Sequence, residues 1–300
     1  MRNTIVLALA CLLVASAPLP AQEVVRPEPE IRIRRAPAAS TGRAPRIDRS
    51  RKPLDPVAAG DDATFRPTVV VRRGTSQGSG TIVASVDGET LVLTASHVVK
   101  AEGPILVELH RYNLGLERRP NAPGWPRRVP AELACDDPAG DVAIVRVAKM
   151  VALPYVAKLS DGDQDALPAD AVLTSVGVDL GTKLSSWKTE LVETASFQLN
   201  ESEVDRPFLI TAKTPEHGRS GGGLFTDQGR LVGVCVGHAE IIQGRRMGVF
   251  ASIDTVHRIL REHDLAVVVD RSMERHARTR RGPTSAVTPT RSRAPAPARR

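Results

Sequence analysis

The segment EHGRSGGGLFTDQGRLVGV, residues 216–234, places one serine, Ser220, inside a run of glycines and follows it with two short apolar stretches. Three glycines directly after Ser220 cannot open a stable helix, because glycine is a poor helix former. The letters LF, TDQG and RLVGV instead have the pattern of a strand, a turn and a second strand. The sequence therefore predicts a serine in a tight glycine loop that leads into a β-hairpin.

Short stretches rich in Val, Ile, Leu and Thr recur on either side of this hairpin, between Gly, Asp, Asn and Pro turns. Examples are TVVVRR at 68–73, TLVLTASHVV at 90–99 and VAIVRVA at 142–148. Turn signals every 8 to 12 residues or so indicate a sandwich or barrel rather than βαβ units. We predict one all-β domain of two packed barrels over residues 64–269, with a single helix at 254–265 that Asp254 caps.

The N-terminal stretch MRNTIVLALACLLVASAPLPA, residues 1–21, has a basic start, an apolar run and small residues before Gln22. This is the pattern of a secretory signal peptide, with cleavage expected after Ala21. The apolar run of roughly 13 residues is short against the ~20 needed to cross a bilayer, and a retained membrane anchor is the alternative. We therefore expect an exported protein in the periplasm, the cell envelope or the medium, with membrane contact only if the segment is retained.

Two further segments, 22–63 and 270–300, are rich in Pro, Ala and Arg and lack apolar periodicity, so we predict disorder for both. The first 60 residues carry a net charge of +5 and the last 30 carry +8, whereas residues 61–270 have 22 Lys/Arg against 28 Asp/Glu. The basic character therefore belongs to the tails. That argues against a specific nucleic-acid-binding domain, although Arg-rich tails can hold an anionic polymer weakly through charge alone.

Cysteine and histidine usage gives little sign of a disulfide scaffold or a metal site. Removal of the signal segment leaves Cys135 and Cys235, which either pair or act as two small buried hydrophobic side chains. No H-E-x-x-H motif occurs, and a spacing of six residues puts His257 and His263 about 120° apart around a helix axis. We predict neither a metal nor a cofactor.

Two motifs upstream of the serine complete a set in a definite order. TASHVV contains His97, and CDDPAGDVAIVRV places Asp141 at the head of an apolar strand. With GSGTIV at 78–83, this order resembles the trypsin-like serine proteases, and in its motifs the HtrA/Deg-type bacterial branch without a PDZ domain. The G-x-S-x-G elbow of α/β-hydrolases does not fit, because it needs a helix after the serine and the order Ser, Asp/Glu, His.

The resemblance covers about residues 66–266 and implies a chymotrypsin-like fold of two six-stranded antiparallel barrels with a C-terminal helix. It also implies a serine endopeptidase acting on proteins or peptides, with His97 as general base, Asp141 orienting it and Ser220 as nucleophile. The backbone N–H groups of Gly218 and Ser220 would form the oxyanion hole. By register with the serine, the substrate pocket would include Thr214 at its base and Val236, Gly237 and His238 along its wall.

Each of these residues also has a structural interpretation. His97 could be a buried structural histidine, Asp136 or Asp137 could replace Asp141, and Ser220 could merely tolerate a tight bend. At the level of the whole chain, a non-catalytic binding module with this fold, held to an envelope polymer by its tails, is the alternative to a protease. An esterase using the same machinery is a third hypothesis, because oxyanion chemistry is common to both enzymes.

Arg219 is the main departure from the family pattern. Members that mature by clipping have Asp directly before the catalytic serine, where it pairs with the new N-terminus, and a guanidinium would repel that ammonium. The sequence near Thr64 also lacks an I-V-G-G-like start. We therefore predict a protease that is not activated by N-terminal insertion, in which Arg219 reaches either solvent or an acidic partner; a serine loop that stays misformed until substrate or an effector binds is the alternative. With no acid at Thr214, we expect a preference for small or medium apolar side chains before the scissile bond.

Overall fold

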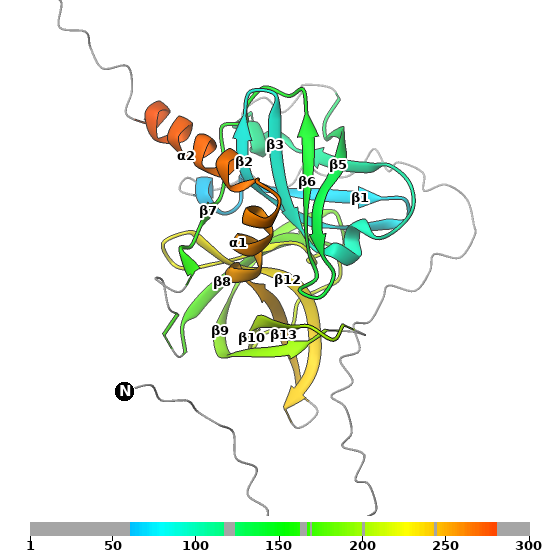
Figure 1. Cartoon of the computed structure of the whole chain (residues 1–300), viewed down its shortest axis with the longest axis vertical. Coiled ribbons are helices and arrows are strands. Elements are labelled where there is room, and N and C mark those ends of the chain that lie inside the picture. The colour runs from blue at the N-terminus through cyan, green and yellow to red at the C-terminus, as the bar shows by residue number, and fades with distance from the viewer. Residues whose placement is uncertain are drawn as a thin grey trace, which may run out of the picture. The chain divides into compact units, whose positions relative to one another are not determined.

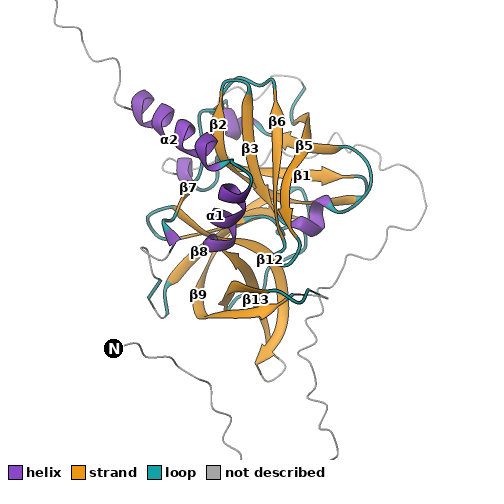
Figure 2. Ribbon diagram, viewed as in Figure 1, coloured by secondary structure: helices purple, strands orange, loops and turns teal. Residues whose placement is uncertain are grey.

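The structure, a computed structural model, describes residues 61–116, 124–162, 167–168, 170–199, 202–242 and 245–280. The predicted signal peptide, most of the predicted N-terminal linker and the end of the basic tail lie outside the described residues. Strands dominate the described part, as predicted, and form two groups (Figures 1 and 2).

The first group is a closed antiparallel barrel with strand order β1-β2-β3-β6-β5-β4. Val92 faces the barrel interior, whereas its neighbours Leu91 and Leu93 belong to a second cluster outside this barrel. Both faces of β3 are therefore buried, which explains why its sequence is an unbroken apolar run. The strands are β1 (Thr68–Arg73), β2 (Ser76–Val86), β3 (Glu89–Thr94), β4 (Ile105–Leu109), β5 (Arg127–Asp137) and β6 (Val142–Ala148).

The second group has the order β11-β8-β9-β10-β13-β12, and an additional β11–β12 pairing closes these six strands into a ring. Each strand contributes to one interior cluster, which includes Leu173, Leu191, Leu209, Leu224, Cys235 and Phe250. The two-barrel prediction is thus confirmed, with β7 (Lys158–Leu159) added in parallel to β12. The six strands are β8 (Val172–Asp179), β9 (Lys183–Gln198), β10 (Asp205–Thr211), β11 (Gly223–Phe225), β12 (Arg230–Ile242) and β13 (Arg245–Ser252).

Helix α1 (Ile253–Glu262) lies between the two groups of strands (Figure 1) and buries Val256, Ile259 and Leu260 in the cluster between the barrels. Its cap is Ser252, whose hydroxyl accepts from the backbone N–H of Asp254 at 3.3 Å. The prediction of Asp254 as the cap was therefore wrong. Strand β13 runs directly into the helix, so its last residue already has the extended conformation that a cap requires.

Helix α2 (Ala266–Arg280) corrects the expected start of the disordered tail at residue 270. It packs along β2, where the buried hydroxyl of Ser272 accepts from the N–H of Ser85 at 2.8 Å and donates to its carbonyl at 3.2 Å. The sequence does not indicate this helix, because a serine and a few scattered apolar residues anchor it rather than a continuous apolar stripe.

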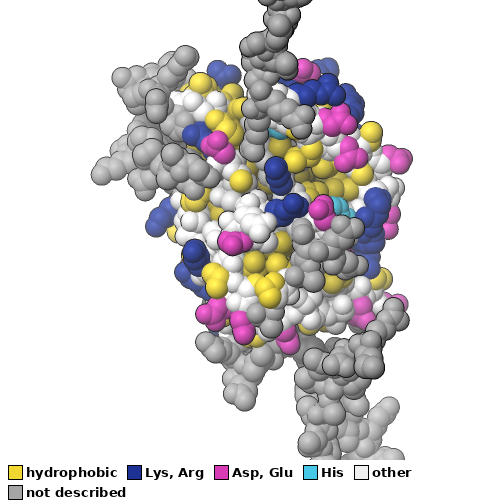
Figure 3. All heavy atoms as spheres, turned by 90° about the vertical axis from the view of Figure 1, so that its left-hand side faces the viewer, with side chains coloured by type: hydrophobic (Ala, Val, Ile, Leu, Met, Phe, Trp, Pro, Cys, Tyr) yellow, Lys and Arg dark blue, Asp and Glu magenta, His cyan; other side chains and the backbone are white. Residues whose placement is uncertain are grey.

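The described surface carries charges of both signs. On the face shown in Figure 3, Lys/Arg and Asp/Glu side chains are intermixed, with apolar side chains between them. This distribution matches the near balance of charge over residues 61–270 in the sequence. Of the helices in the described part of the chain, none has both the length and the apolarity needed to cross a membrane.

Asp137, at the end of β5, joins the first barrel to the second and to α1. Its carboxylate accepts from Nε of Arg206 at 2.7 Å and from Nη2 of the same side chain at 3.4 Å. Nη2 of Arg258, on α1, donates to it as well. Asp137 is only 7% exposed, so two arginines from separate elements converge on one largely buried carboxylate, and Arg258 also pairs with Glu262 at 2.6 Å.

We expect Asp137→Ala to lower the free energy of unfolding by about 3 kcal/mol, because it leaves the partly buried guanidinium of Arg206 without its carboxylate and leaves Arg258 with Glu262 as its remaining carboxylate partner. Urea unfolding at neutral pH measures this loss. Glu274→Ala is the matched control, since it removes an exposed pair with Arg278 on α2 and should cost less than about 1 kcal/mol. Equal losses in the two variants would contradict the role assigned to Asp137.

Candidate active site

His97 and Asp141 form a close pair at the edge of the first barrel. His97 lies in the 3-10 helix η2 (Ser96–Val99), just after β3, and Asp141 directly precedes β6. Nδ1 of His97 is 2.6 Å from Oδ2 of Asp141, and the His97 backbone N–H donates to Oδ1 at 2.9 Å. Asp141 is 3% exposed whereas the His97 side chain is 37% exposed. A carboxylate at Nδ1 favours the tautomer whose Nε2 is an unprotonated acceptor.

The backbone of Asp141 adopts φ = 53°, an uncommon conformation for a residue other than glycine. Two contacts to η2 hold it there, since its carbonyl accepts from the N–H of Ser96 at 3.1 Å while its carboxylate binds His97. Such strain persists only where the surrounding structure enforces it. The nearby Asp136 instead accepts from the hydroxyl of Ser96, and Asp137 binds arginines. Of the three candidate aspartates, Asp141 alone contacts His97.

The loop with Ser220 crosses from the second barrel to the first. The Ser220 carbonyl accepts from the N–H of Ser79 on β2 at 2.7 Å. At Gly221, where φ is +84°, a Cβ atom would lie 2.2 Å from the Ser79 carbonyl oxygen and 2.4 Å from Oγ1 of Thr94. Only glycine allows this approach, which brings the serine against the end of β3, three residues before His97.

Ser220 and His97 are not hydrogen-bonded to each other in the described part of the chain. Oγ of Ser220 instead donates to the carbonyl of Val236 on β12 at 3.3 Å. Rotation about the Cα–Cβ bond of Ser220 would release this contact without any backbone change. Hydrogen bonds between catalytic groups are often completed only when substrate is bound.

We call residues 216–222 the oxyanion loop, after the role that the resemblance implies for Gly218 and Ser220, and two of its carbonyl groups bind groups outside the loop. The carbonyl of His217 accepts from the N–H of Leu180 at 2.7 Å, and that of Gly218 accepts from Oγ of Ser79 at 2.8 Å. In a planar trans peptide the N–H points opposite to the C=O, so the Gly218 N–H faces away from Leu180. Among the described residues, neither the Gly218 nor the Ser220 N–H donates to a protein acceptor. Both N–H groups are therefore unpaired within the described part of the chain.

Arg219 is fully buried and has an acidic partner, one of the two outcomes predicted for it. Its Nε and Nη2 donate to Oδ1 and Oδ2 of Asp179, at the end of β8, at 2.9 and 3.0 Å. Nη1 donates to the hydroxyl of Ser175 at 3.2 Å, Nη2 also donates to Ser185, and the guanidinium carbon lies 4.9 Å from the ring centre of Trp187. The side chain thus points into the second barrel.

A family model described as a trypsin-like peptidase domain matches residues 78–234, which include His97, Asp141 and Ser220. The match spans just over half of the sequence. The chain belongs to the trypsin-like peptidase family. No curated protein matches it significantly.

Solved structures similar to this trypsin-like peptidase include two of the Rv3671c protease from M. tuberculosis H37Rv. The first, a serine-to-alanine mutant in an inactive form, is 21% identical with a TM-score of 0.53, covering 68% of this chain and 90% of its own. The second, also an inactive form, has 21% identity, a TM-score of 0.52, and coverage of 67% and 91%.

The apo protease domain of MamO from Magnetospirillum magneticum is similar as well, with 17% identity, a TM-score of 0.52, and coverage of 66% of this chain and 97% of its own. At identities this low, the three structures show the fold alone. The resemblance to the HtrA/Deg branch stays a prediction.

The predicted pocket residues of this peptidase lie near the open edge of β12. After Cys235, β12 pairs only with β13 within the described residues, and a Cβ atom on Gly237 would meet nothing within 4 Å. Val236 is buried, and half-buried His238 lies opposite Gly248 of β13. The Thr214 hydroxyl donates to the Arg246 carbonyl of β13 at 3.2 Å. Their role in substrate selection stays a prediction.

The two cysteines are free and buried, in different clusters, which settles the alternative that the sequence left open. Burial raises the pKa of Cys135 to about 11 and that of Cys235 to about 12. Cys235 supports the serine loop through its backbone, since its carbonyl accepts from the Gly221 N–H at 2.7 Å and its N–H donates to the Gly222 carbonyl at 2.8 Å.

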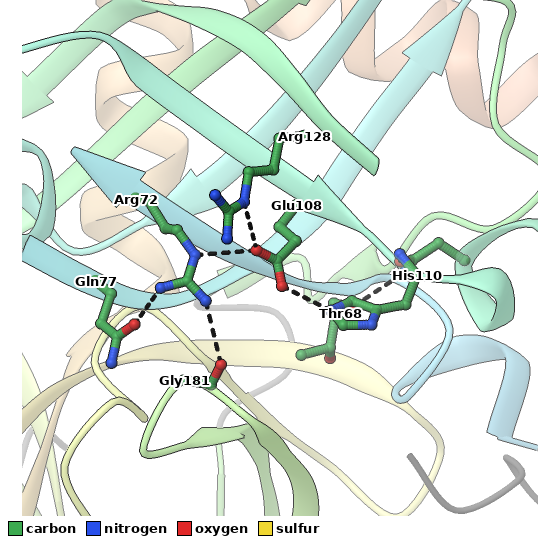
Figure 4. A network of polar contacts seen from close by, with 8 residues as sticks. Thr68, Arg72, Gln77, Glu108, His110, Arg128 and Gly181 are labelled. Atoms are coloured by element: carbon green, nitrogen blue, oxygen red, sulfur yellow. Dashed lines mark hydrogen bonds and ion pairs between the residues drawn. The ribbon is translucent and has the colours of Figure 1, made fainter. Parts of the chain in front are cut away.

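A buried glutamate connects the first barrel to the turn beside the oxyanion loop (Figure 4). Glu108 on β4 accepts from Nε of Arg72 at 3.0 Å and from Nε of Arg128 at 3.1 Å, and Nε2 of His110 lies 3.4 Å from its other oxygen. Nη2 of Arg72 in turn donates a hydrogen bond to the carbonyl of Gly181 at 3.4 Å. Sequence reasoning missed this network, because its members come from separate strands without a motif.

Burial alone would raise the pKa of Glu108, but hydrogen bonds from His110 and Arg72, together with their charges, lower it from 4.5 to about 2. A carboxylate with a depressed folded-state pKa stabilises the protein above its unfolded-state pKa, and this contribution is lost as the pH falls through the folded-state value. The stabilisation by ionised Glu108, roughly 3 kcal/mol, should therefore disappear between about pH 4.5 and pH 2.

We expect Glu108→Gln to be less stable than the wild type near pH 6, with a difference that shrinks as the pH falls through about 4.5 toward 2. Urea unfolding across this range measures the difference, and Glu274→Gln on the exposed face of α2 serves as the control. A wild-type-to-variant difference that stays constant with pH would show that the charge of Glu108 is not the source.

Thiol reagents should leave both cysteines of the folded protein unmodified. At pH 8 buried thiols with pKa values of about 11 and 12 are thiolates in only about one molecule per thousand or fewer. Iodoacetamide treatment followed by peptide mapping should find Cys135 and Cys235 labelled only after unfolding. A disulfide-linked peptide in the unreduced digest would contradict the structure.

Proposed function

We propose that this trypsin-like peptidase is an exported serine endopeptidase that uses His97, Asp141 and Ser220 and forms an acyl-enzyme. The main support is the oxyanion loop, in which the backbone N–H groups of Gly218 and Ser220 have no acceptor among the described residues. Both groups are therefore available next to the proposed nucleophile. The His97–Asp141 pair, on the first barrel, supplies a base whose tautomer leaves Nε2 free to accept a proton. A histidine and an aspartate that served only the core would not require such a loop.

The reaction would begin with rotation of the Ser220 hydroxyl from the carbonyl of Val236 toward His97. Nε2 of His97 takes the hydroxyl proton as Oγ bonds to the substrate carbonyl carbon, and Asp141 stabilises the resulting imidazolium. The N–H groups of Gly218 and Ser220 stabilise the oxyanion. His97 then gives its proton to the leaving amine as the peptide bond breaks. Water attacks the acyl-enzyme by the same route and releases the acid.

The substrate chain would lie along the open edge of β12, where Gly237 leaves room for another backbone. Thr214 is uncharged, so no acidic group at the proposed pocket base would bind a Lys or Arg side chain. We propose that Val236, Gly237 and His238 line a pocket for a small or medium apolar side chain. Substrates of this kind are proteins or peptides.

This proposal does not include activation by insertion of a new N-terminus. The residue before Ser220 is the cation Arg219, which already forms an ion pair with Asp179 and would repel a second positive charge. Export would depend on residues 1–21, with the signal cleaved after Ala21 or retained as an anchor. The Arg-rich tails would add weak contacts to an anionic envelope polymer. These segments lie largely outside the described residues, and the sequence alone supports the proposals about them.

Labelling with a fluorophosphonate serine-hydrolase probe tests the function. The wild type should react, whereas Ser220→Ala should not, and His97→Ala should react roughly 10,000-fold more slowly or worse. Ser202→Ala is the control for a serine outside the site and should match the wild type. Circular dichroism confirms that each variant is folded.

A folded wild type that is as unreactive as Ser220→Ala would rule out the enzyme and favour the non-catalytic binding module. The observation that favours a non-catalytic module is that Ser220 donates its hydrogen bond to Val236 rather than to His97. If the wild type reacts, a peptide library and an ester substrate then separate an endopeptidase from an esterase.

A further inference from the structure

Arg219 fastens the oxyanion loop to the second barrel. Its side chain has no exposed surface, and Nε and Nη2 make the two-pronged contact with Asp179 that arginine and carboxylate favour. Its remaining partners are also on β8 and β9. A buried guanidinium is satisfied only while residue 219 keeps its place. Since Arg219 lies between Gly218 and Ser220, its side chain limits where both oxyanion donors can move.

Asp179 stands at a strained turn between β8 and β9. The next two residues, Leu180 and Gly181, have φ values of 53° and 66°, the combination of a type I′ hairpin turn. This conformation is unfavourable for leucine, whose side chain here is 66% exposed and gains little from packing. The Leu180 N–H, however, donates to the carbonyl of His217. The turn therefore contacts the oxyanion loop at a second point, one residue before Gly218.

The first barrel holds this turn from the other side. Arg72, oriented by Glu108, donates to the Gly181 carbonyl (Figure 4). Gln77 donates to the carbonyl of Leu180 at 3.4 Å. The N–H of Val178 donates to Oγ of Ser79, the same hydroxyl that binds the Gly218 carbonyl. The turn is thus anchored to both barrels before it reaches the loop.

We propose that Asp179 and Arg219 are positioning residues whose buried ion pair holds the oxyanion loop in its reactive form from the moment the chain folds. The inference rests on the function proposed above and adds its mode of activation. In members activated by clipping, a negative charge before the serine waits for a cationic N-terminus. Here the positive charge belongs to the loop, and the negative charge comes from a strand already in place. No cleavage is required.

The test combines three variants of the full chain: Arg219→Met, Asp179→Asn and the apolar pair Asp179→Leu with Arg219→Met. Two measurements are made on each, the second-order rate of fluorophosphonate labelling at Ser220 and amide hydrogen exchange over residues 214–223. We expect labelling to slow roughly 100- to 1,000-fold in Arg219→Met and in the double variant, as for loss of an oxyanion donor. Exchange in the loop should rise about 10-fold or more.

Thermal unfolding separates this effect from a general loss of stability. An apolar pair often restores the stability lost when one partner of a buried ion pair is removed, so the double variant should fold yet stay slow. Arg206→Met is the matched control, because it removes an arginine–carboxylate contact in which no residue of the loop takes part and should keep the wild-type labelling rate. Should the double variant not fold, Asp179→Asn decides, with an expected slowing of about 10-fold.

Wild-type labelling and wild-type loop exchange in the folded double variant, or in Asp179→Asn, would overturn the proposal. Failure of the proposed function gives a different pattern, in which the wild type itself does not label. Loop exchange then decides alone: faster exchange in the variants still supports the positioning role of the ion pair, and unchanged exchange refutes it.

Discussion

The close approach of Ser79 and Ser220 is the contact on which the rest of the site depends. It joins two barrels that each fold around their own interior, and it leaves no space for a Cβ atom at Gly221. Because the two backbones meet so tightly, the position of the serine loop relative to the end of β3 is fixed. His97 and Asp141, which belong wholly to the first barrel, can therefore be matched to a serine that belongs to the second.

A buried arginine beside Ser220 is costly, since its charge must leave water and find compensation within the protein. Asp179, two serine hydroxyls and the face of Trp187 provide that compensation. The same contacts restrict the oxyanion loop. The guanidinium of Arg219, which is costly to bury, therefore also fixes the backbone between Gly218 and Ser220. The trypsin-like fold thus tolerates an inverted charge at this position when a strand of the second barrel supplies the counter-charge.

Much of the architecture could be read from local patterns. The two barrels, the helix at α1 and the pairing of His97 with Asp141 follow from strand-like runs and from motifs in order. The errors came where a distant contact decides local structure. Ser272 holds α2 against β2 through a hydrogen bond to the backbone of Ser85, and neither serine is a sequence signal for a helix. The cap at Ser252 was missed because a strand residue took the role expected of Asp254.

The sequence by itself determined the all-β fold and the order of His97, Asp141 and Ser220, because periodicity and motif order are properties of the chain. It also showed that the basic charge belongs to the tails. Only the tertiary structure decided that the cysteines stay apart, that Ser220 turns toward Val236, and that Arg219 finds Asp179. These outcomes depend on which segments the fold brings together, and contacts between residues 16 or 40 positions apart leave no local signal in the sequence.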